Sequence, residues 1–234
     1  MSLAEQLQSA ERLQFASNLA HWIEGGLFAA IAVIALLQAL GYINSKAARY
    51  IWPTLIILGG LFLPVYIAIQ GEVKVGLLIN DPQQIEHALI AFLLVLAGSA
   101  EILLVAGIFQ RKFWRFIAPA ALAAIGIILF VHTEYGTPEA VAEAVSKHRY
   151  QGAMVMLVGL LKSAEVQWQR TIKWLAYPWI VALFITAILL ITYREPKGAY
   201  LTQSATQKFT DTLRSRTPLG TVFLARRLKY GYSN

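Results

Sequence analysis

Residues 131–149 read VHTEYGTPEAVAEAVSKHR and lie between two long apolar runs. This stretch holds His132 and His148, two of the chain's four histidines, together with three carboxylates. Thr137 followed by Pro138 is typical of a helix N-cap with proline at the first helical position. The pattern predicts a helix whose last turn carries the final Lys-His-Arg, so we expect an ordered connector between two membrane spans.

The composition of the whole chain identifies the class of protein. Of its 234 residues, 57% are hydrophobic and only 14% are charged, whereas charged residues make up about a quarter of a soluble domain. The mean hydropathy is +0.56. The chain is therefore an integral membrane protein, and the absence of cysteine excludes disulfides, thiolate metal sites and thiol catalysis.

The net charge of +7 could indicate binding to nucleic acid. However, the basic residues lie in short loops between apolar runs and in the last forty or so residues, as expected of loops and tails of membrane proteins. We therefore expect no nucleic acid partner. The expected partners are the lipid bilayer and either other membrane subunits or further copies of the chain.

Six apolar segments are each about as long as a bilayer core requires, and they cover residues 22–43, 52–69, 87–109, 113–131, 150–168 and 174–193. Before them, residues 1–20 predict an amphipathic helix at the membrane interface. After the transmembrane domain at 21–193, residues 194–234 predict a basic tail on the membrane surface or on a partner. The expected fold is an all-α bundle of about six transmembrane helices, in the bacterial inner (plasma) membrane.

The distribution of the four histidines gives the main functional signal. If the six spans run back and forth across the membrane, all four histidines fall on one membrane face: His21, His87, His132 and His148. Each of the first three has a carboxylate within three residues, namely Glu24, Glu86 and Glu134. Imidazole and carboxylate donors together suit zinc, copper(II) or non-haem iron. The candidate metal ligands are therefore His21, Glu24, His87, His132 and His148.

Two other interpretations of the histidines stay open. Histidine is amphipathic and common at membrane interfaces, so each one alone could be an interfacial residue. Two histidines could also hold a b-type haem axially, although these lie at the ends of spans, and haem ligands usually lie a turn or more inside. No spacing is a strong motif, because His21 and Glu24 form a bare His-x-x-Glu without the second histidine of zinc proteases.

A second set of polar residues lies inside the apolar segments. Glu101 is embedded in the third segment, and Lys162 and Glu165 interrupt the fifth, three residues apart on one helical face. Ionisable groups within spans are costly and mark ion or proton pathways, or else they pair with each other. The sequence leaves open an intramembrane relay and a structural ion pair.

The loop charges predict an orientation. Loops on the face away from the histidines carry basic residues, so the positive-inside rule places the histidines on the periplasmic or outer face. The basic tail contradicts this, because six spans put it on the histidine face as well. Either the tail departs from the rule, which we favour, or the fifth segment does not cross and the tail is cytoplasmic.

The leading hypothesis is a membrane protein that handles a transition metal, copper first, in uptake, delivery or resistance, or that serves as an auxiliary subunit of a membrane metalloenzyme. A second hypothesis is a membrane oxidoreductase with a non-haem metal or b-type haem. A third is a purely structural subunit of a membrane complex. The sequence alone does not decide whether the protein is an enzyme.

Overall fold

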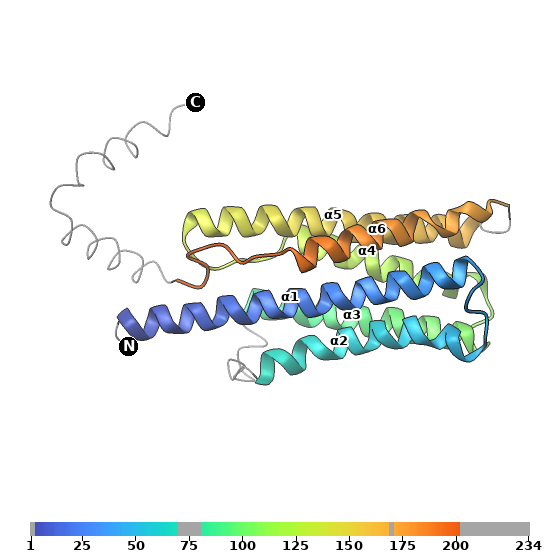
Figure 1. Cartoon of the computed structure of the whole chain (residues 1–234), viewed down its shortest axis with the longest axis horizontal. Helices are drawn as coiled ribbons and strands as arrows, with labels where there is room; N and C mark the ends of the chain where they lie inside the picture. Colours follow the sequence, from blue (N-terminus) through green and yellow to red (C-terminus); the bar gives the residue numbers. More distant parts are fainter. Residues whose placement is uncertain (1–2, 70–80, 169–170, 202–234) are drawn as a thin grey trace, which may run out of the picture.

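The computed structural model describes residues 3–69, 81–168 and 171–201, and within these ranges the chain is all-α (Figure 1). The long helices are α1 (Leu3–Ala39), α2 (Ile51–Ile69), α3 (Pro82–Val105), α4 (Ile117–Phe130), α5 (Pro138–Trp168) and α6 (Pro178–Ile191). Short 3₁₀ helices precede three of them: η1 (Ala47–Tyr50), η2 (Lys112–Phe116) and η3 (Lys173–Ala176). The predicted all-α membrane bundle is confirmed.

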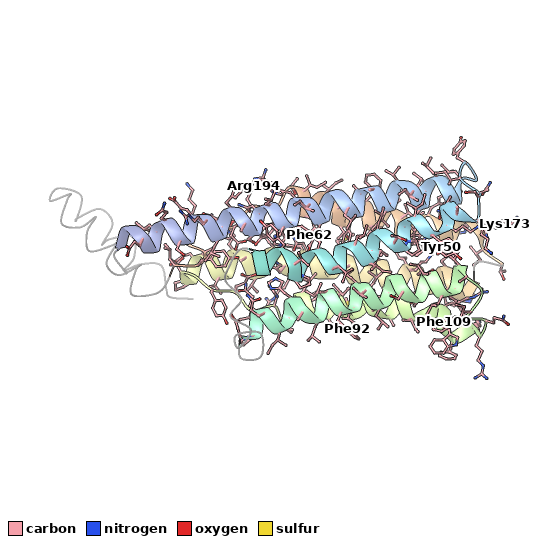
Figure 2. All side chains as sticks on the ribbon, turned by 90° about the horizontal axis from the view of Figure 1, so that it is seen from below. Tyr50, Phe62, Phe92, Phe109, Lys173 and Arg194 are labelled. Carbon is pink, nitrogen blue, oxygen red and sulfur yellow. The ribbon has the colours of Figure 1, made fainter. Side chains whose placement is uncertain are left out.

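The helices form a closed ring. Each helix packs against the next in the sequence, and α6 packs against α1, so the first and last helices complete the ring (Figure 1). The interior is filled by aliphatic and small side chains such as Ile31, Ala97 and Val158. Large apolar side chains also cover the outside, where Phe92, labelled in Figure 2, is 61% exposed. An apolar exterior of this kind is suited to lipid.

Within the described residues, five regions, which overlap α1, α2, α3, α4 and α6, are long and apolar enough to cross a membrane. α5 is long enough at 31 residues, but it does not belong to that set. It nevertheless packs side by side with α4 and α6 (Figure 1). Within α5, Nζ of Lys162 lies 2.6 Å from Oε2 of Glu165, so the predicted ion pair is present. The two charges neutralise each other inside the helix, and α5 can occupy its position in the ring.

Several element boundaries differ from the sequence-based expectations. Residues 3–39 form one helix, so the predicted interfacial segment continues directly into the first span. The connector helix does not end at Arg149, because no helix-breaking residue follows it before the apolar run, and α5 continues to Trp168. α3 begins at Pro82, since the side chain of Asp81 accepts a hydrogen bond from the backbone N–H of Gln83 and caps the helix.

The two ends of the bundle differ in chemistry. The connectors at 40–50, 106–116 and 171–177 lie at one end, where Figure 2 labels Tyr50, Phe109 and Lys173. The connector at 131–137 and the segment 193–201, which we call the C-terminal strap, lie at the other end (Figure 1). We call the end that holds the 131–137 connector and the strap the histidine end. The predicted basic tail from residue 202 onward lies outside the described residues, as does any test of its amphipathic character.

Candidate functional site

The structure brings the four histidines together at the histidine end. His21 comes from α1, His87 from the first turns of α3, His132 from the connector after α4, and His148 from α5. The ring centroids are 5.6 Å apart for His21 and His148, 4.7 Å for His148 and His132, and 5.0 Å for His132 and His87. The four imidazoles therefore form one continuous row across the interior of the ring.

The most compact part of this row is a group of His132, Glu134 and His148, whose candidate ligand atoms all lie within 4.8 Å of one another. Oε1 of Glu134 lies 2.8 Å from Nδ1 of His148 and 3.6 Å from Nε2 of His132. The side chains are only 2%, 3% and 5% exposed for His132, Glu134 and His148. This buried group could hold a metal ion.

Backbone carbonyls fix the orientation of two imidazoles. Nδ1 of His21 lies 2.8 Å from the carbonyl oxygen of Ser17, and Nδ1 of His148 lies 3.1 Å from that of Ala144, one turn earlier in each helix. A carbonyl oxygen only accepts hydrogen bonds, so both Nδ1 atoms must carry the proton. In the neutral ring, Nε2 is then left with a free lone pair, as it is in metal-binding histidines.

These two free nitrogens face each other. Nε2 of His21 lies 3.4 Å from Nε2 of His148. With Nδ1 donating to a carbonyl in each ring, neither neutral imidazole has a proton on Nε2 to offer the other. The pair is therefore two acceptors in contact, which is unfavourable in a buried place unless a cation lies between them.

A carboxylate holds the third imidazole. Nδ1 of His132 lies 2.8 Å from Oε2 of Glu86. The same carboxylate accepts hydrogen bonds from the backbone N–H and the hydroxyl of Thr133, at 2.7 and 2.9 Å. A carboxylate that accepts a hydrogen bond from a histidine fixes the ring and strengthens it as a ligand, and Glu86 lies close enough to Nδ1 of His132 to do so. His132 thus presents Nε2 toward Glu134.

The electrostatics of the site favour a bound cation. Burial, followed by the neighbouring His87, His148 and His21, lowers the pKa of His132 to about 2, so this ring is neutral at physiological pH. Neutral imidazole is the form that binds metals. The carboxylate of Glu134 adds negative charge beside it, which a divalent cation would neutralise.

The C-terminal strap covers the site from outside the bundle. Tyr193 stacks on His21 with centroids 4.0 Å apart and rings inclined by 16°. Its hydroxyl donates to Oε2 of Glu195 at 3.1 Å, and the hydroxyl of Ser17 donates to the same atom at 2.7 Å. The N–H of Glu195 donates to Oδ1 of Asn18. The strap is therefore fastened to the face of α1 that carries His21.

Local sequence features position the two halves of the compact group. Thr137 caps α5 through its hydroxyl, which accepts from the N–H of Ala140 at 3.3 Å, so the predicted N-cap is confirmed. Gly126 of α4 and Gly152 of α5 bring the two backbones into contact, since a Cβ on either would lie 2.6 to 2.7 Å from the other's carbonyl oxygen. This close approach places the connector after α4 beside the first turns of α5.

A cavity of about 320 Å³ lies inside the ring and is lined by all four histidines. Its walls also include Glu24 and Gln151, and its deeper part is apolar, with Phe28, Leu94 and Leu122 among the lining residues. Oε1 of Glu24 and both side-chain polar atoms of Gln151 are buried without a hydrogen bond. The site therefore borders an interior space with unsatisfied polar groups.

The second predicted polar set lies beyond that apolar floor. Glu101 and Lys162 line a separate cavity of about 30 Å³, close to the volume of one water molecule. Nζ of Lys162 also lies 4.2 Å from the ring centroid of Trp179. These contacts agree with a structural role for the Lys162–Glu165 ion pair. A proton or ion relay through Glu101 stays a prediction.

The structure thus brings the four predicted histidines together, but the carboxylate in the compact group is Glu134 and not Glu24. His21, His87, His132 and His148 form the row, whereas Glu24 lines the cavity outside the compact group. Glu134 was absent from the candidate ligands, although its position two residues after His132 was the available signal. Neither the stacking of Tyr193 nor the burial of Glu195 had a signal in the sequence.

Comparison of the chain with models of protein families, with curated proteins and with solved structures finds no match.

Proposed function

We propose that this membrane bundle binds a transition metal ion through Nε2 of His21 and His148, with His132 as a further ligand and with the Glu134 carboxylate behind the protonated Nδ1 of His148. The observation that carries the proposal is the contact of two unprotonated ring nitrogens at 3.4 Å. Metal bonds of 2.0 to 2.1 Å arranged tetrahedrally hold two nitrogen ligands about 3.4 Å apart. The two imidazoles therefore have the spacing of neighbouring ligands on one ion.

The donor set favours copper among the candidate metals. The three proposed donors are imidazoles, with the carboxylates of Glu86 and Glu134 behind two of them, and divalent copper binds such sites more tightly than zinc or iron does, whereas the tetrahedral spacing of 3.4 Å is that of zinc. A b-type haem is less well supported. Its iron lies between two axial nitrogens with the macrocycle in the plane between them, and a gap of 3.4 Å beside the ring of His132 leaves little room for this.

Metal handling, in uptake, delivery or resistance, is the role we propose first, or service as an auxiliary subunit of a membrane metalloenzyme. The site lies near one end of the spans: His148 is about 20 residues before the end of α5, or about 30 Å along a helix, which is the thickness of a bilayer core. An ion could therefore reach it from one aqueous face. Partner subunits and self-association stay predictions.

A membrane oxidoreductase is the second candidate, and a specific observation favours it. Catalytic metal sites keep one coordination position open toward substrate, and here the proposed ligands line a cavity large enough for a small organic molecule. We also propose that the protein lies in the bacterial inner membrane, with the histidine end on the periplasmic side.

The experiment that tests the site is elemental analysis of the purified protein. We expect near-stoichiometric copper, zinc or iron in the wild type, and a loss of most of it in His132→Ala and His148→Ala. Glu139→Ala and Glu143→Ala are matched controls, because both residues are exposed on the same helix. Equal metal content in the wild type and both histidine variants would refute the site.

A further inference from the structure

The cavity that borders the histidines contains polar groups that the protein leaves unsatisfied. Gln151 is only 2% exposed, and neither its amide nitrogen nor its amide oxygen has a hydrogen-bond partner. It lies on α5 one turn deeper than His148, on the same helical face. A buried amide without partners costs free energy. Gln151 is therefore placed to bind something that enters the cavity.

The cavity changes from polar to apolar with depth. Its histidines lie at the level of His148, and Val155, two turns further along α5, lies among the apolar residues of the deeper part. Phe28, Leu94 and Leu122 belong to that part and separate it from the small cavity at Glu101. A ligand that fits this profile has a polar head and an apolar body. The volume of about 320 Å³ is at the lower end of that of ordinary ligand pockets.

The charges of the walls restrict the head group. The described residues that line the cavity include the acids Glu24 and Asp81 but no lysine or arginine. Carboxylate, phosphate and sulfate heads would find no lysine or arginine to pair with, so fatty acids and phospholipids are disfavoured. Aromatic side chains in the walls, such as Phe28 and Tyr66, suit a flat ring. These features favour a neutral aromatic head.

We propose that the cavity binds the ring of a membrane-soluble hydroquinone, with a ring hydroxyl on the amide of Gln151 and the apolar part of the molecule on the floor at Leu122. A hydroxyl both donates and accepts a hydrogen bond, so it satisfies the amide oxygen and the amide nitrogen together. The oxidised quinone only accepts and leaves the amide oxygen unpaired. This proposal goes beyond metal binding and does not require the metal to be present.

The test is equilibrium binding of decylubiquinol and decylubiquinone to the purified protein in lipid nanodiscs, with metal content measured on the same samples. We expect one saturable quinol site per chain, with the quinol bound more tightly than the quinone. Gln151→Leu should weaken quinol binding about tenfold, since two neutral hydrogen bonds are lost. Leu122→Phe, which fills the floor, should weaken it too, whereas Gln110→Leu, at an exposed position at the other end, should not.

Three results would overturn the proposal: no saturable quinol binding by the wild type, equal affinity in the Gln151 and Gln110 variants, or tighter binding of a long-chain alcohol or amine than of the quinol. Gln151→Leu removes only unpaired polar atoms from the interior, so loss of binding would not reflect misfolding. Quinol binding without any bound metal would refute the proposed metal site and leave this proposal standing. Bound metal without quinol binding would refute the quinol proposal and leave the proposed metal site standing.

Discussion

Nε2 of His21 and Nε2 of His148 lie 3.4 Å apart, although the two residues are 127 positions apart in the sequence. His21 uses its Nδ1 proton on a carbonyl of its own helix, and Nδ1 of His148 faces both a carbonyl of its own helix and Oε1 of Glu134. Folding therefore brings two lone pairs together and gives neither of them a proton. Most of the predictions below follow from this relationship and from the residues that hold it in place.

Replacing His21 by alanine should weaken metal binding by more than replacing His87 does. His21 offers Nε2 directly to His148, whereas His87 packs edge-on against His132 with centroids 5.0 Å apart. We expect a loss beyond roughly 100-fold for His21→Ala, which exceeds the usual effect of an outer partner, and about tenfold or less for His87→Ala. Competition with a chelator of known affinity measures both. A larger loss of metal affinity in His87→Ala than in His21→Ala would show that His87 is the ligand and His21 the outer residue.

Glu86→Gln should lower metal affinity roughly 10- to 100-fold without abolishing binding. The carboxylate lies 2.8 Å from Nδ1 of His132 and accepts two hydrogen bonds from Thr133. The amide keeps the shape but removes the charge that strengthens the imidazole. Glu139→Gln on the exposed surface of α5 is the control. An unchanged affinity in Glu86→Gln would show that His132 is not a ligand in this orientation.

Glu195 should make the strap less stable as the pH rises. Burial raises the pKa of Glu195 above its ordinary value of 4.5, with the nearby Glu134 raising it further, while hydrogen bonds from Ser17 and Tyr193 and the nearby His148 lower it. The folded protein therefore holds a proton at pH values where the unfolded carboxyl is ionised. The contribution of Glu195 to the free energy of unfolding is greatest near and below pH 4.5, and it decreases as the pH rises above that value.

Thermal unfolding of the detergent-solubilised protein between pH 5 and 8 checks this prediction for Glu195. The wild type should unfold at lower temperature as the pH rises, and Glu195→Gln should show a flatter dependence, because the amide does not titrate. Parallel pH curves for the two proteins would mean that another group causes the effect.

Single cysteines should report the two ends of the bundle, since the native chain has none. Ser146, exposed at the histidine end, should react with an impermeant thiol reagent in intact cells, and Ser45, exposed at the other end, should react only after permeabilisation. A cysteine at Ser204 should behave like Ser146, because the strap leaves the bundle at the histidine end. Labelling at Ser45 in place of Ser146 would reverse the orientation.

The outcome at Ser204 also tests the number of crossings. The charge rule applies less strictly to long terminal segments than to short loops, which is why the basic tail can share a face with the histidines. If Ser146 is labelled and Ser204 is not, the tail lies on the opposite membrane face, and α5 does not cross as the ring of helices requires.

Several features followed from the sequence because they depend on local properties of the chain. The apolar runs predicted a helical membrane bundle, since the backbone in lipid must satisfy its own hydrogen bonds. The Thr137–Pro138 pair predicted the start of α5, and the spacing of Lys162 and Glu165 predicted their contact. Alternating spans also placed the four histidines at one end, a conclusion that needs only the direction of each helix.

Only the tertiary structure decided which of these groups meet and how they are oriented. The path of the connector between α4 and α5 placed Glu134 in the compact group, the rotation of α1 about its axis left Glu24 outside it, and no local pattern encodes either. The closure of α6 on α1 set Tyr193 against His21 and buried Glu195 of the strap against α1. Such contacts depend on packing between segments far apart in the chain, because a helix presents whichever face its neighbours leave room for.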